Sequence, residues 1–250
     1  MDKIARFYDL DYGDFELDVL FYKNYAELSG SPILELACGT GRLLVPLAHA
    51  GFEVTGIDIS PAMLEAARGK LRVGLDRRVH LVRADARDLS LDRRFTMAFF
   101  ALNSFCHLTT LEDQVNALEG AYRHLAPEGR LILDLINPDI SYLTGSQREL
   151  ILNWVKQDPA TGNEVVKYSS SFLDPARQLQ HVTFVYDETG EDGHVRRTTA
   201  GFSLHYFFRY EVELLLERCG FYVEALYGSY DLEDYYSQSE KMIFSARRRP

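Results

Sequence analysis

The sequence predicts an α/β fold in which a seven-stranded sheet has a reversed last strand and an antiparallel β insert follows the fifth strand. Three observations support this prediction. From residue 31 onward short apolar runs alternate with helical periods, residues 141–208 change to a period of two, and a helix with two further strands closes the chain. Strands that alternate with helices form parallel sheets with right-handed crossovers, whereas period-two runs form half-buried antiparallel strands.

The first half of the chain is expected to contain five strands and three helices. Leu111, Val115 and Leu118 recur at the i, i+3/i+4 spacing of a helix. Ser60 before Pro61 predicts a helix start, and the segment Pro127–Gly129 predicts a helix stop before the fifth strand. The expected strands are Pro32–Ala37, Glu53–Ile57, Val79–Arg83, Thr96–Ala101 and Arg130–Ile136, and the expected helices lie near Arg42–Ala50, Pro61–Leu71 and Leu111–Leu125.

The second half is expected to hold the insert and the end of the sheet. Polar and glycine-containing or proline-containing turns separate three candidate antiparallel strands, which are Glu164–Phe172, Gln178–Asp187 and Val195–Phe207. A helix at Tyr210–Arg218, ended by Gly220, precedes strands at Phe221–Tyr227 and Met242–Ala246 that pair as a hairpin. The predicted division is a core of residues 1–140 and 209–250 and an insert of residues 141–208, which covers the substrate or forms an interface with a second copy.

Composition excludes several classes of protein. The 250 residues are 46% apolar and 26% charged, which is typical of a globular chain. The 27 basic and 37 acidic residues give a net charge of −10, which repels polyanions, so we expect no nucleic-acid partner. Three scattered cysteines indicate neither structural zinc nor a disulfide framework. No apolar stretch approaches the ~20 residues of a membrane span, so we expect a cytoplasmic protein without membrane contact.

A glycine turn follows the first expected strand and opens a helix. The segment from Glu35 to Gly41 reads E-L-A-C-G-T-G, and its glycines allow a ligand to approach the backbone because glycine lacks a Cβ atom. A glycine pair alone fits any dinucleotide-binding domain. Leu44, however, stands where a dinucleotide site has its third glycine. This departure favours a ligand that has no pyrophosphate.

Two carboxylates follow the next two expected strands. Asp58 comes directly after the second strand, where a carboxylate accepts both hydroxyl hydrogens of a ribose. Asp85 follows the third strand, in a position suited to the exocyclic amine of an adenine. Either residue alone fits a helix cap or a turn. Together with Glu35, in order after three successive strands, they predict an adenosyl ligand.

The run from Ser31 to Asp139 resembles the class I S-adenosylmethionine-dependent methyltransferases, which have a Rossmann-like sheet with a reversed last strand. The resemblance lies in E-x-A-x-G-x-G from Glu35, D-I-S-P-x-M-L from Asp58, Asp85-Ala86 and L-x-P-x-G-R from Leu125. It implies that Gly39 and Gly41 approach the methionine part, that Asp58 holds the ribose, that Ile59 and Met63 flank the adenine, and that Asp85 and Ala86 recognise its amine. The cofactor residues it implies are Glu35, Ala37, Cys38, Gly39, Gly41, Asp58, Ile59, Met63, Asp85, Ala86 and Asn103.

The segment after the fourth strand is expected to face the acceptor. Its N-S-F-C-H-L, from Asn103, resembles glycine N-methyltransferases and, more loosely, amino-sugar N-methyltransferases, which also carry an antiparallel insert. The opening Y-D-L-D-Y, ending at Tyr12, resembles the N-terminal active-site lid of the amino-sugar enzymes. Glycine is a poor candidate substrate, because Ile136 stands where glycine methyltransferases place a carboxylate-binding arginine.

Two residues are candidates for catalysis. His107 either accepts a proton from the acceptor, since an ordinary histidine pKa of ~6.5 suits neutral pH, or only fixes its loop by bonding to the backbone. Tyr12 either orients the nucleophile or lies against the sulfonium by a cation–π contact, or it is an amphipathic packing residue. Tyrosines and acidic residues of the loop 228–241 are a further, weaker indication of an amine acceptor.

The leading hypothesis is a methyltransferase that uses S-adenosylmethionine, releases S-adenosylhomocysteine, needs no metal and acts on a small molecule, at nitrogen, by in-line transfer. Transfer to oxygen or carbon and non-catalytic binding of S-adenosylmethionine remain alternatives. A nicotinamide oxidoreductase is disfavoured by Glu35, by Leu44 and by the reversed last strand. The expected partners are the acceptor and, through the insert, a second copy of the chain. The identity of the acceptor does not follow from the sequence.

Overall fold

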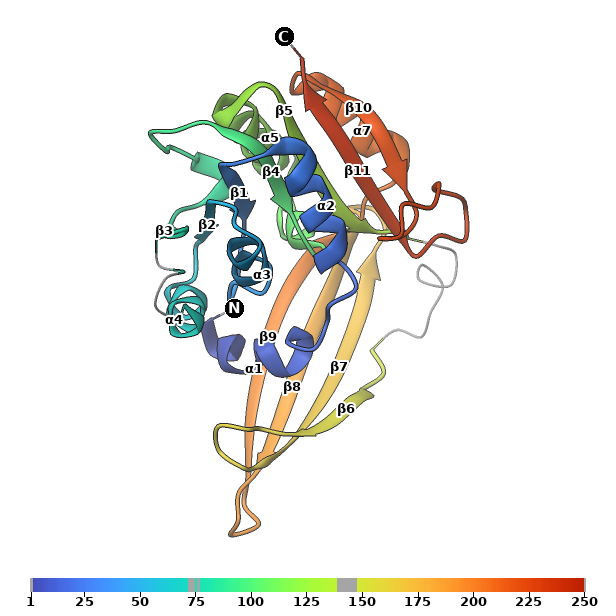
Figure 1. The fold of residues 1–250 in the computed structure, drawn as a ribbon. Helices are drawn as coiled ribbons and strands as arrows, with labels where there is room; N and C mark the ends of the chain where they lie inside the picture. Colours follow the sequence, from blue (N-terminus) through green and yellow to red (C-terminus); the bar gives the residue numbers. More distant parts are fainter. Residues whose placement is uncertain (1, 72–74, 76, 139–147, 250) are drawn as a thin grey trace.

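Two β-sheets organise the molecule. In the computed structural model, which describes residues 2–71, 75, 77–138 and 148–249, seven strands form a large sheet in the order β10-β11-β5-β4-β1-β2-β3. Four more strands form a separate antiparallel sheet in the order β6-β7-β8-β9 (Figure 1). This arrangement confirms the predicted fold class.

The large sheet is parallel except at its last strand. Its strands are β1 (Ile33–Leu36), β2 (Val54–Asp58), β3 (Val79–Arg83), β4 (Phe95–Phe100), β5 (Leu125–Ile136), β10 (Phe221–Tyr227) and β11 (Lys241–Arg248). Strand β11 runs antiparallel to both β5 and β10, as the sequence predicted. Strands β2 and β3 extend the sheet on one side of the adjacent pair β1 and β4, and β5 extends it on the other side. The chain order therefore reverses between β1 and β4, and open α/β sheets bind ligands at the carboxyl ends of the strands at such a point.

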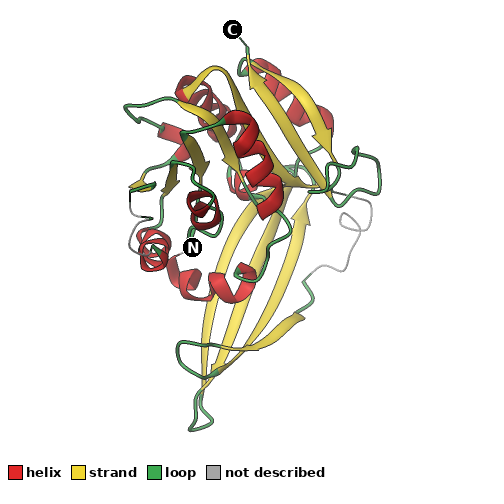
Figure 2. Cartoon of the chain, in the orientation of Figure 1, coloured by secondary structure: helices red, strands yellow, loops and turns green. Residues whose placement is uncertain are grey.

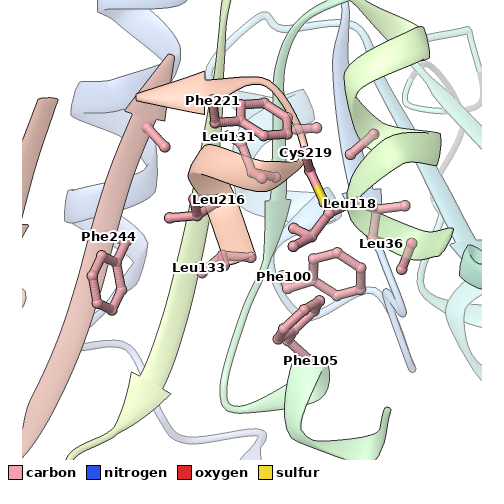
Figure 3. Close-up of a cluster of buried hydrophobic side chains, with 14 of the residues drawn as sticks. Leu36, Phe100, Phe105, Leu118, Leu131, Leu133, Leu216, Cys219, Phe221 and Phe244 are labelled. Carbon is pink, nitrogen blue, oxygen red and sulfur yellow. The ribbon is translucent and has the colours of Figure 1, made fainter. Parts of the chain in front are cut away.

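Helices cover both faces of the large sheet (Figure 2). The α-helices are α1 (Ala5–Tyr12), α2 (Val19–Ser29), α3 (Leu44–His49), α4 (Pro61–Lys70), α5 (Leu111–His124) and α7 (Arg209–Arg218), and three short 3₁₀ helices are η1 (Asp2–Ile4), η2 (Ala86–Asp88) and η3 (Ser104–His107). Helices α2, α3 and α4 share one buried cluster with the sheet, and α5 and α7 share the other. The second cluster includes Phe100, Leu118 and Leu216, whose side chains lie between sheet and helices (Figure 3).

Local signals explain where two helices begin. The Ser60 hydroxyl accepts a hydrogen bond from the Met63 backbone N–H at 3.2 Å, which caps α4 ahead of Pro61 as predicted. At the start of α5 the Thr110 hydroxyl accepts one from the Asp113 N–H at 3.1 Å. These bonds satisfy N–H groups that have no partner within the helix.

The structure differs from the predicted local structure in three places. No element was assigned before residue 31, yet α1 and α2 lie there. Strand β5 begins at Leu125 and not at Arg130, because α5 ends at His124 and the chain pairs at once with Phe95 through an irregular register. The described residues of the insert form four strands and not the predicted three, since β6 (Ile151–Gln157) precedes β7 (Glu164–Asp174), β8 (Leu179–Thr189) and β9 (Val195–His205).

The second sheet extends beyond the carboxyl edge of the large one, and α1 lies against it (Figure 1). The rings of Phe7 in α1 and Tyr186 in β8 stack with centroids 4.3 Å apart. The predicted start of the insert, between residues 140 and 141, lies outside the described residues, so the proposed domain limits stay a prediction. In the described part of the chain no helix has the length and apolar character that a membrane crossing requires.

Candidate active site

A cavity of about 440 Å³ lies at the carboxyl edge of the large sheet. Its volume falls within the roughly 300–1,000 Å³ of small-molecule sites. All but one of the predicted site residues line it, namely Tyr12, Glu35, Ala37, Cys38, Gly39, Asp58, Ile59, Met63, Asp85, Ala86, Asn103 and His107. Helix α1 and the insert contribute the remaining walls, so residues far apart in the sequence enclose one space.

The exception is Gly41, which lines a larger and more open hollow of about 1000 Å³ on the outer side of the glycine turn. Gly41 has a φ of +74°, and a Cβ atom there would come within 3.3 Å of the Ala67 Cβ. Its role in this structure is therefore to shape the turn and allow α4 to pack closely. The smaller cavity is the better candidate site, because it is more enclosed and gathers the other predicted residues.

The glycine turn is built from left-handed backbone. Ala37 and Gly39 have φ values of 58° and 55°. Such a φ costs little at glycine, whereas at alanine it is strain, of order 1–3 kcal/mol, of a kind that clusters at functional sites. The Gly39 N–H donates to Asp58 Oδ2 at 2.9 Å, so the turn after β1 is fastened to the end of β2.

Asp58 is a buried carboxylate with spare acceptor capacity. Besides the bond from Gly39, its Oδ1 accepts the Ser60 N–H at 2.8 Å. Burial raises the pKa of Asp58, and the two backbone N–H donors oppose this shift. A carboxylate has about four acceptor positions, so about two remain for a ligand.

Glu35 carries an unsatisfied polar atom at the cavity. The residue is 4% exposed, and its Oε2 has no hydrogen-bond partner. Burial raises the pKa of Glu35 well above its ordinary value, and the nearby Arg42 guanidinium opposes this. Arg42 itself makes a bidentate pair with Asp18, at 2.7 and 2.5 Å. An orphaned buried oxygen at a cavity wall suits a ligand that donates a hydrogen bond.

Asp85 is paired with a residue that the sequence analysis did not single out. The Arg87 side chain binds both carboxylate oxygens, with Nε to Oδ1 at 2.9 Å and Nη2 to Oδ2 at 2.6 Å. The Arg87 backbone N–H also donates to Oδ1 at 2.9 Å. The pairing lowers the pKa of Asp85 and keeps the carboxylate ionised at the cavity wall. In the sequence, the spacing of two residues between Asp85 and Arg87 was the only indication of this ion pair.

A buried aspartate accepts hydrogen bonds from the acceptor-facing turn after β4 and so fixes the position of this turn. Leu102 and Asn103 are consecutive residues with left-handed φ values of 44° and 61°. The Leu102 N–H donates to Asp134 Oδ2 at 2.9 Å, and the Asn103 N–H donates to the Asp134 carbonyl at 3.0 Å. The Tyr230 hydroxyl, at 2.7 Å, and Lys241 Nζ, at 3.0 Å, also bind this fully buried carboxylate. The C-terminal hairpin thereby supports the turn.

The two catalytic candidates, Tyr12 and His107, both line the cavity. His107, at the end of η3, is exposed to the cavity, its ring 5.5 Å from that of Phe202. Within the described residues neither ring nitrogen has a hydrogen-bond partner, so no bond to the backbone fixes the loop there. The surrounding protein lowers the pKa of His107 below its ordinary value. Tyr12 is half-buried at the end of α1, and desolvation raises the pKa of its phenol.

Helix α1 is fastened to the insert by a buried carboxylate. The Asp11 side chain is 4% exposed and accepts three hydrogen bonds, from Trp154 Nε1 at 2.9 Å, Lys167 Nζ at 2.6 Å and the Tyr186 hydroxyl at 2.6 Å. Its neighbour Tyr12 is thereby held over the cavity. The Y-D-L-D-Y segment carried this aspartate, but its three partners come from residues 143 to 175 positions away, which no local pattern shows.

The insert supplies the wall beyond Asn103 and His107. Phe184 of β8 and Phe202 of β9 line the cavity with their rings 5.0 Å apart in an edge-on arrangement. Leu204 of β9 lies in the same wall. The loop 228–241 does not contribute, because its Tyr230 and Tyr235 hydroxyls turn to Asp134 and Asn137. The predicted aromatic and acidic rim from this loop is therefore not part of the cavity.

The described residues contain no group of three or more His, Cys, Asp or Glu side chains arranged to hold a metal ion. The three cysteines are free and buried. Burial raises the pKa of Cys38, which lines the cavity, well above its ordinary value, so its thiol is protonated and unreactive.

Comparison with known proteins finds methyltransferases whose sequences are similar to this chain. Residues 33–129 match the family described as "Methyltransferase domain". A putative methyltransferase, YqeM, of Bacillus subtilis is 29% identical over 86% of this chain and 83% of its own. The cypemycin N-terminal methyltransferase of a Streptomyces species is 27% identical over 92% of this chain and 89% of its own. Amino-sugar N,N-dimethyltransferases and glycine/sarcosine N-methyltransferases match 48–62% of the chain.

The fold agrees with these relatives. The solved structure of the sugar N-methyltransferase KedS8 from Streptoalloteichus superposes with a TM-score of 0.77 and 24% identity, over 97% of this chain and 93% of that one. At this identity the likeness concerns the fold alone. Together with the sequence matches it confirms the resemblance that the motifs predicted.

Proposed function

We propose that this chain, which is an S-adenosylmethionine-dependent methyltransferase, transfers the methyl group to a nitrogen of a small-molecule acceptor. The observation that carries the proposal is that one cavity joins two sets of residues. One set, at the ends of β1, β2 and β3, suits an adenosyl cofactor. The other set, Tyr12, Asn103 and His107 with the insert, forms the opposite wall and suits an acceptor.

The residues present fit the cofactor. The orphaned Glu35 Oε2 and the left-handed turn at Gly39 offer an acceptor and a close backbone approach to the methionine part. Asp58 keeps free acceptor positions for the ribose hydroxyls, as argued above. Ile59 and Met63 are the apolar groups that flank the adenine, and Asp85 with Ala86 recognises its amine. In this assignment Gly41 shapes the turn without touching the ligand.

The chain's own residues then bind, orient and deprotonate the acceptor. When bound, S-adenosylmethionine supplies a methyl group on a sulfonium, which an acceptor nitrogen takes in line. His107 accepts the proton that the nitrogen loses, because its lowered pKa leaves the imidazole neutral at pH 7. Tyr12, held by the bonds of Asp11, orients the acceptor. Helix α1 and the insert exclude water from the cavity.

Two kinds of support favour nitrogen over oxygen and carbon. A neutral amine is nucleophilic before it loses a proton, whereas an alcohol has to pass its proton to a base as it attacks. The names of several relatives, among them the cypemycin N-terminal methyltransferase and the amino-sugar dimethyltransferases, place their own reactions at nitrogen.

The test is transfer of a deuterated methyl group. The purified chain is incubated with S-adenosylmethionine carrying a CD3 group and with panels of amines, alcohols and activated carbon acids. Fragmentation in the mass spectrometer then locates the label. We expect CD3 on nitrogen in the amine panel and loss of this product in the His107→Ala variant. Label on oxygen or carbon, with unlabelled amines, would overturn the proposal. A parallel titration with NAD is expected to show no binding.

A further inference from the structure

We infer that the part of the acceptor that enters this cavity is a ring-bearing amine, bound in its uncharged form. Any carboxylate or phosphate of the acceptor stays outside the cavity. The inference deepens the proposed function and rests on it. Its basis is the chemistry of the wall that faces the acceptor, together with the pairing of every charged side chain in that wall.

The acceptor-facing wall is aromatic and apolar. Phe184, Phe202 and Leu204 of the insert line it, next to His107. The edge-on Phe184–Phe202 pair presents a broad ring surface, and aromatic rings bind other rings by offset or edge contacts in addition to burying area. A flat or puckered ring with an apolar face fits such a wall. A short, fully polar acceptor such as glycine leaves it uncovered.

Among the described lining residues, no side-chain cation is available for an anion on the acceptor side. Among the described lining residues the only cationic side chains are Arg42 and Arg87. The Arg42 guanidinium is paired in bidentate fashion with the Asp18 carboxylate, and the Arg87 guanidinium is paired with the Asp85 carboxylate. A carboxylate or phosphate of the acceptor, beside Phe184 and Phe202, would lose its hydration without gaining a partner there, which is strongly unfavourable. This agrees with Ile136 at the position where glycine methyltransferases place an arginine.

The acceptor side offers no unpaired carboxylate either. Asp11 is the acidic residue of that side, and its carboxylate already accepts bonds from Trp154, Lys167 and Tyr186. An ammonium ion therefore finds no free counter-ion beside Tyr12. The wall selects the neutral amine, which is the form that has a lone pair for methyl transfer. Tyr12 and His107 remain as polar groups for the N–H bonds.

Matched pairs of amines test the inference. Phenethylamine and phenylalanine share a ring and differ by the carboxylate, whereas cyclohexylamine and glycine differ in both ring and carboxylate. Binding of each to the S-adenosylhomocysteine complex is measured by calorimetry, and kcat/KM for N-methylation is measured separately. We expect the ring amine without a carboxylate to bind more tightly in each pair, by roughly 100-fold or more, since the carboxylate enters unpaired. Equal binding within the pairs, or no binding of either ring amine, overturns the inference.

The two readouts separate the inference from the proposed function. Ring amines that bind with this preference but are never methylated refute the proposed function and leave the charge selection standing. Amines that are methylated regardless of a carboxylate refute the inference and leave the proposed function standing. An amino-deoxysugar, which is also a ring amine without a carboxylate or phosphate, shows whether the ring is a carbocycle or a sugar.

Two variants locate the selectivity. Phe202→Ala is expected to weaken phenethylamine binding by ~10-fold or more while S-adenosylhomocysteine affinity stays within ~2-fold, because the lost area lies on the acceptor side only. Thr199→Ala, at an exposed position of the same strand that does not line the cavity, is the matched control and leaves both affinities unchanged. Leu204→Arg adds a free cation to the acceptor side. It is expected to reduce the ratio of the affinities for phenethylamine and phenylalanine by ~10-fold. An unchanged preference in Leu204→Arg contradicts the inference.

Discussion

Replacement of Asp58 by alanine tests the cofactor site at its most specific contact. The carboxylate accepts two backbone N–H bonds, from Gly39 at 2.9 Å and Ser60 at 2.8 Å, and keeps about two acceptor positions for a ribose. Loss of bonds to a charged group costs about 1.5–3 kcal/mol. The dissociation constant for S-adenosylhomocysteine is therefore expected to rise by roughly 10- to 150-fold, measured by isothermal titration calorimetry.

The same substitution also weakens the fold, because it leaves two backbone donors without partners. Ser60→Ala provides the control, since it removes the α4 cap, worth about 0.5–2 kcal/mol, and leaves the ribose partner in place. We expect it to lower Tm while cofactor affinity changes by less than ~2-fold. Comparable loss of affinity in Ser60→Ala would show that local destabilisation is the cause.

A second comparison isolates the ribose contact itself. Wild-type protein is expected to bind adenosine more tightly than 2′,3′-dideoxyadenosine, and Asp58→Ala is expected to bind both alike. Such a cycle cancels any general damage to the loop, because both ligands meet the same loop. If the variant still distinguished the two nucleosides by the wild-type factor, Asp58 would not be the ribose ligand.

Three further predictions concern the acceptor side and the core. His107→Ala should lower kcat by roughly 10²–10⁴-fold with cofactor affinity nearly intact. Since burial lowers the pKa of His107, the wild-type rate should fall only when the pH drops below about 6.5. A rate that already falls above this pH would contradict the assignment of His107 as the base. Asp134→Asn should reduce kcat more than it changes the dissociation constant of the cofactor, because it frees the Leu102 turn, and an equal effect on both would point to a general structural role. Gly56→Ala should lower the free energy of unfolding by about 1–3 kcal/mol. The reason is that a Cβ atom at this position would lie 2.5 Å from the Leu44 Cδ1 and 2.8 Å from the Cys38 Sγ. Unchanged thermal unfolding of the variant would refute this packing.

The cofactor half of the site could be predicted because parallel strands end at one edge. Once Glu35, Asp58 and Asp85 were placed after three successive strands, their meeting followed from topology alone. Periodicity likewise located most of the large sheet and the helices between its strands. Strand β6 was not predicted, because its side chains are mostly exposed and none of them is fully buried.

The residues that support the site escaped prediction for a different reason. Asp134 and Asp11 are each buried carboxylates, and each is satisfied by donors from strands or loops far along the chain. Periodicity shows which residues are buried, but it does not show which polar groups meet inside. Partner choice of this kind depends on how the insert and the C-terminal hairpin pack, which only the folded structure reveals.

We propose that the 440 Å³ cavity, and not the larger hollow outside the glycine turn, holds the cofactor. A crystal structure of the chain with S-adenosylhomocysteine distinguishes the two locations. We expect ligand density along Glu35 and Gly39, with the ribose at Asp58 and the adenine beside Asp85. Density in the 1000 Å³ hollow, against Gly41 and away from Asp58, would contradict it.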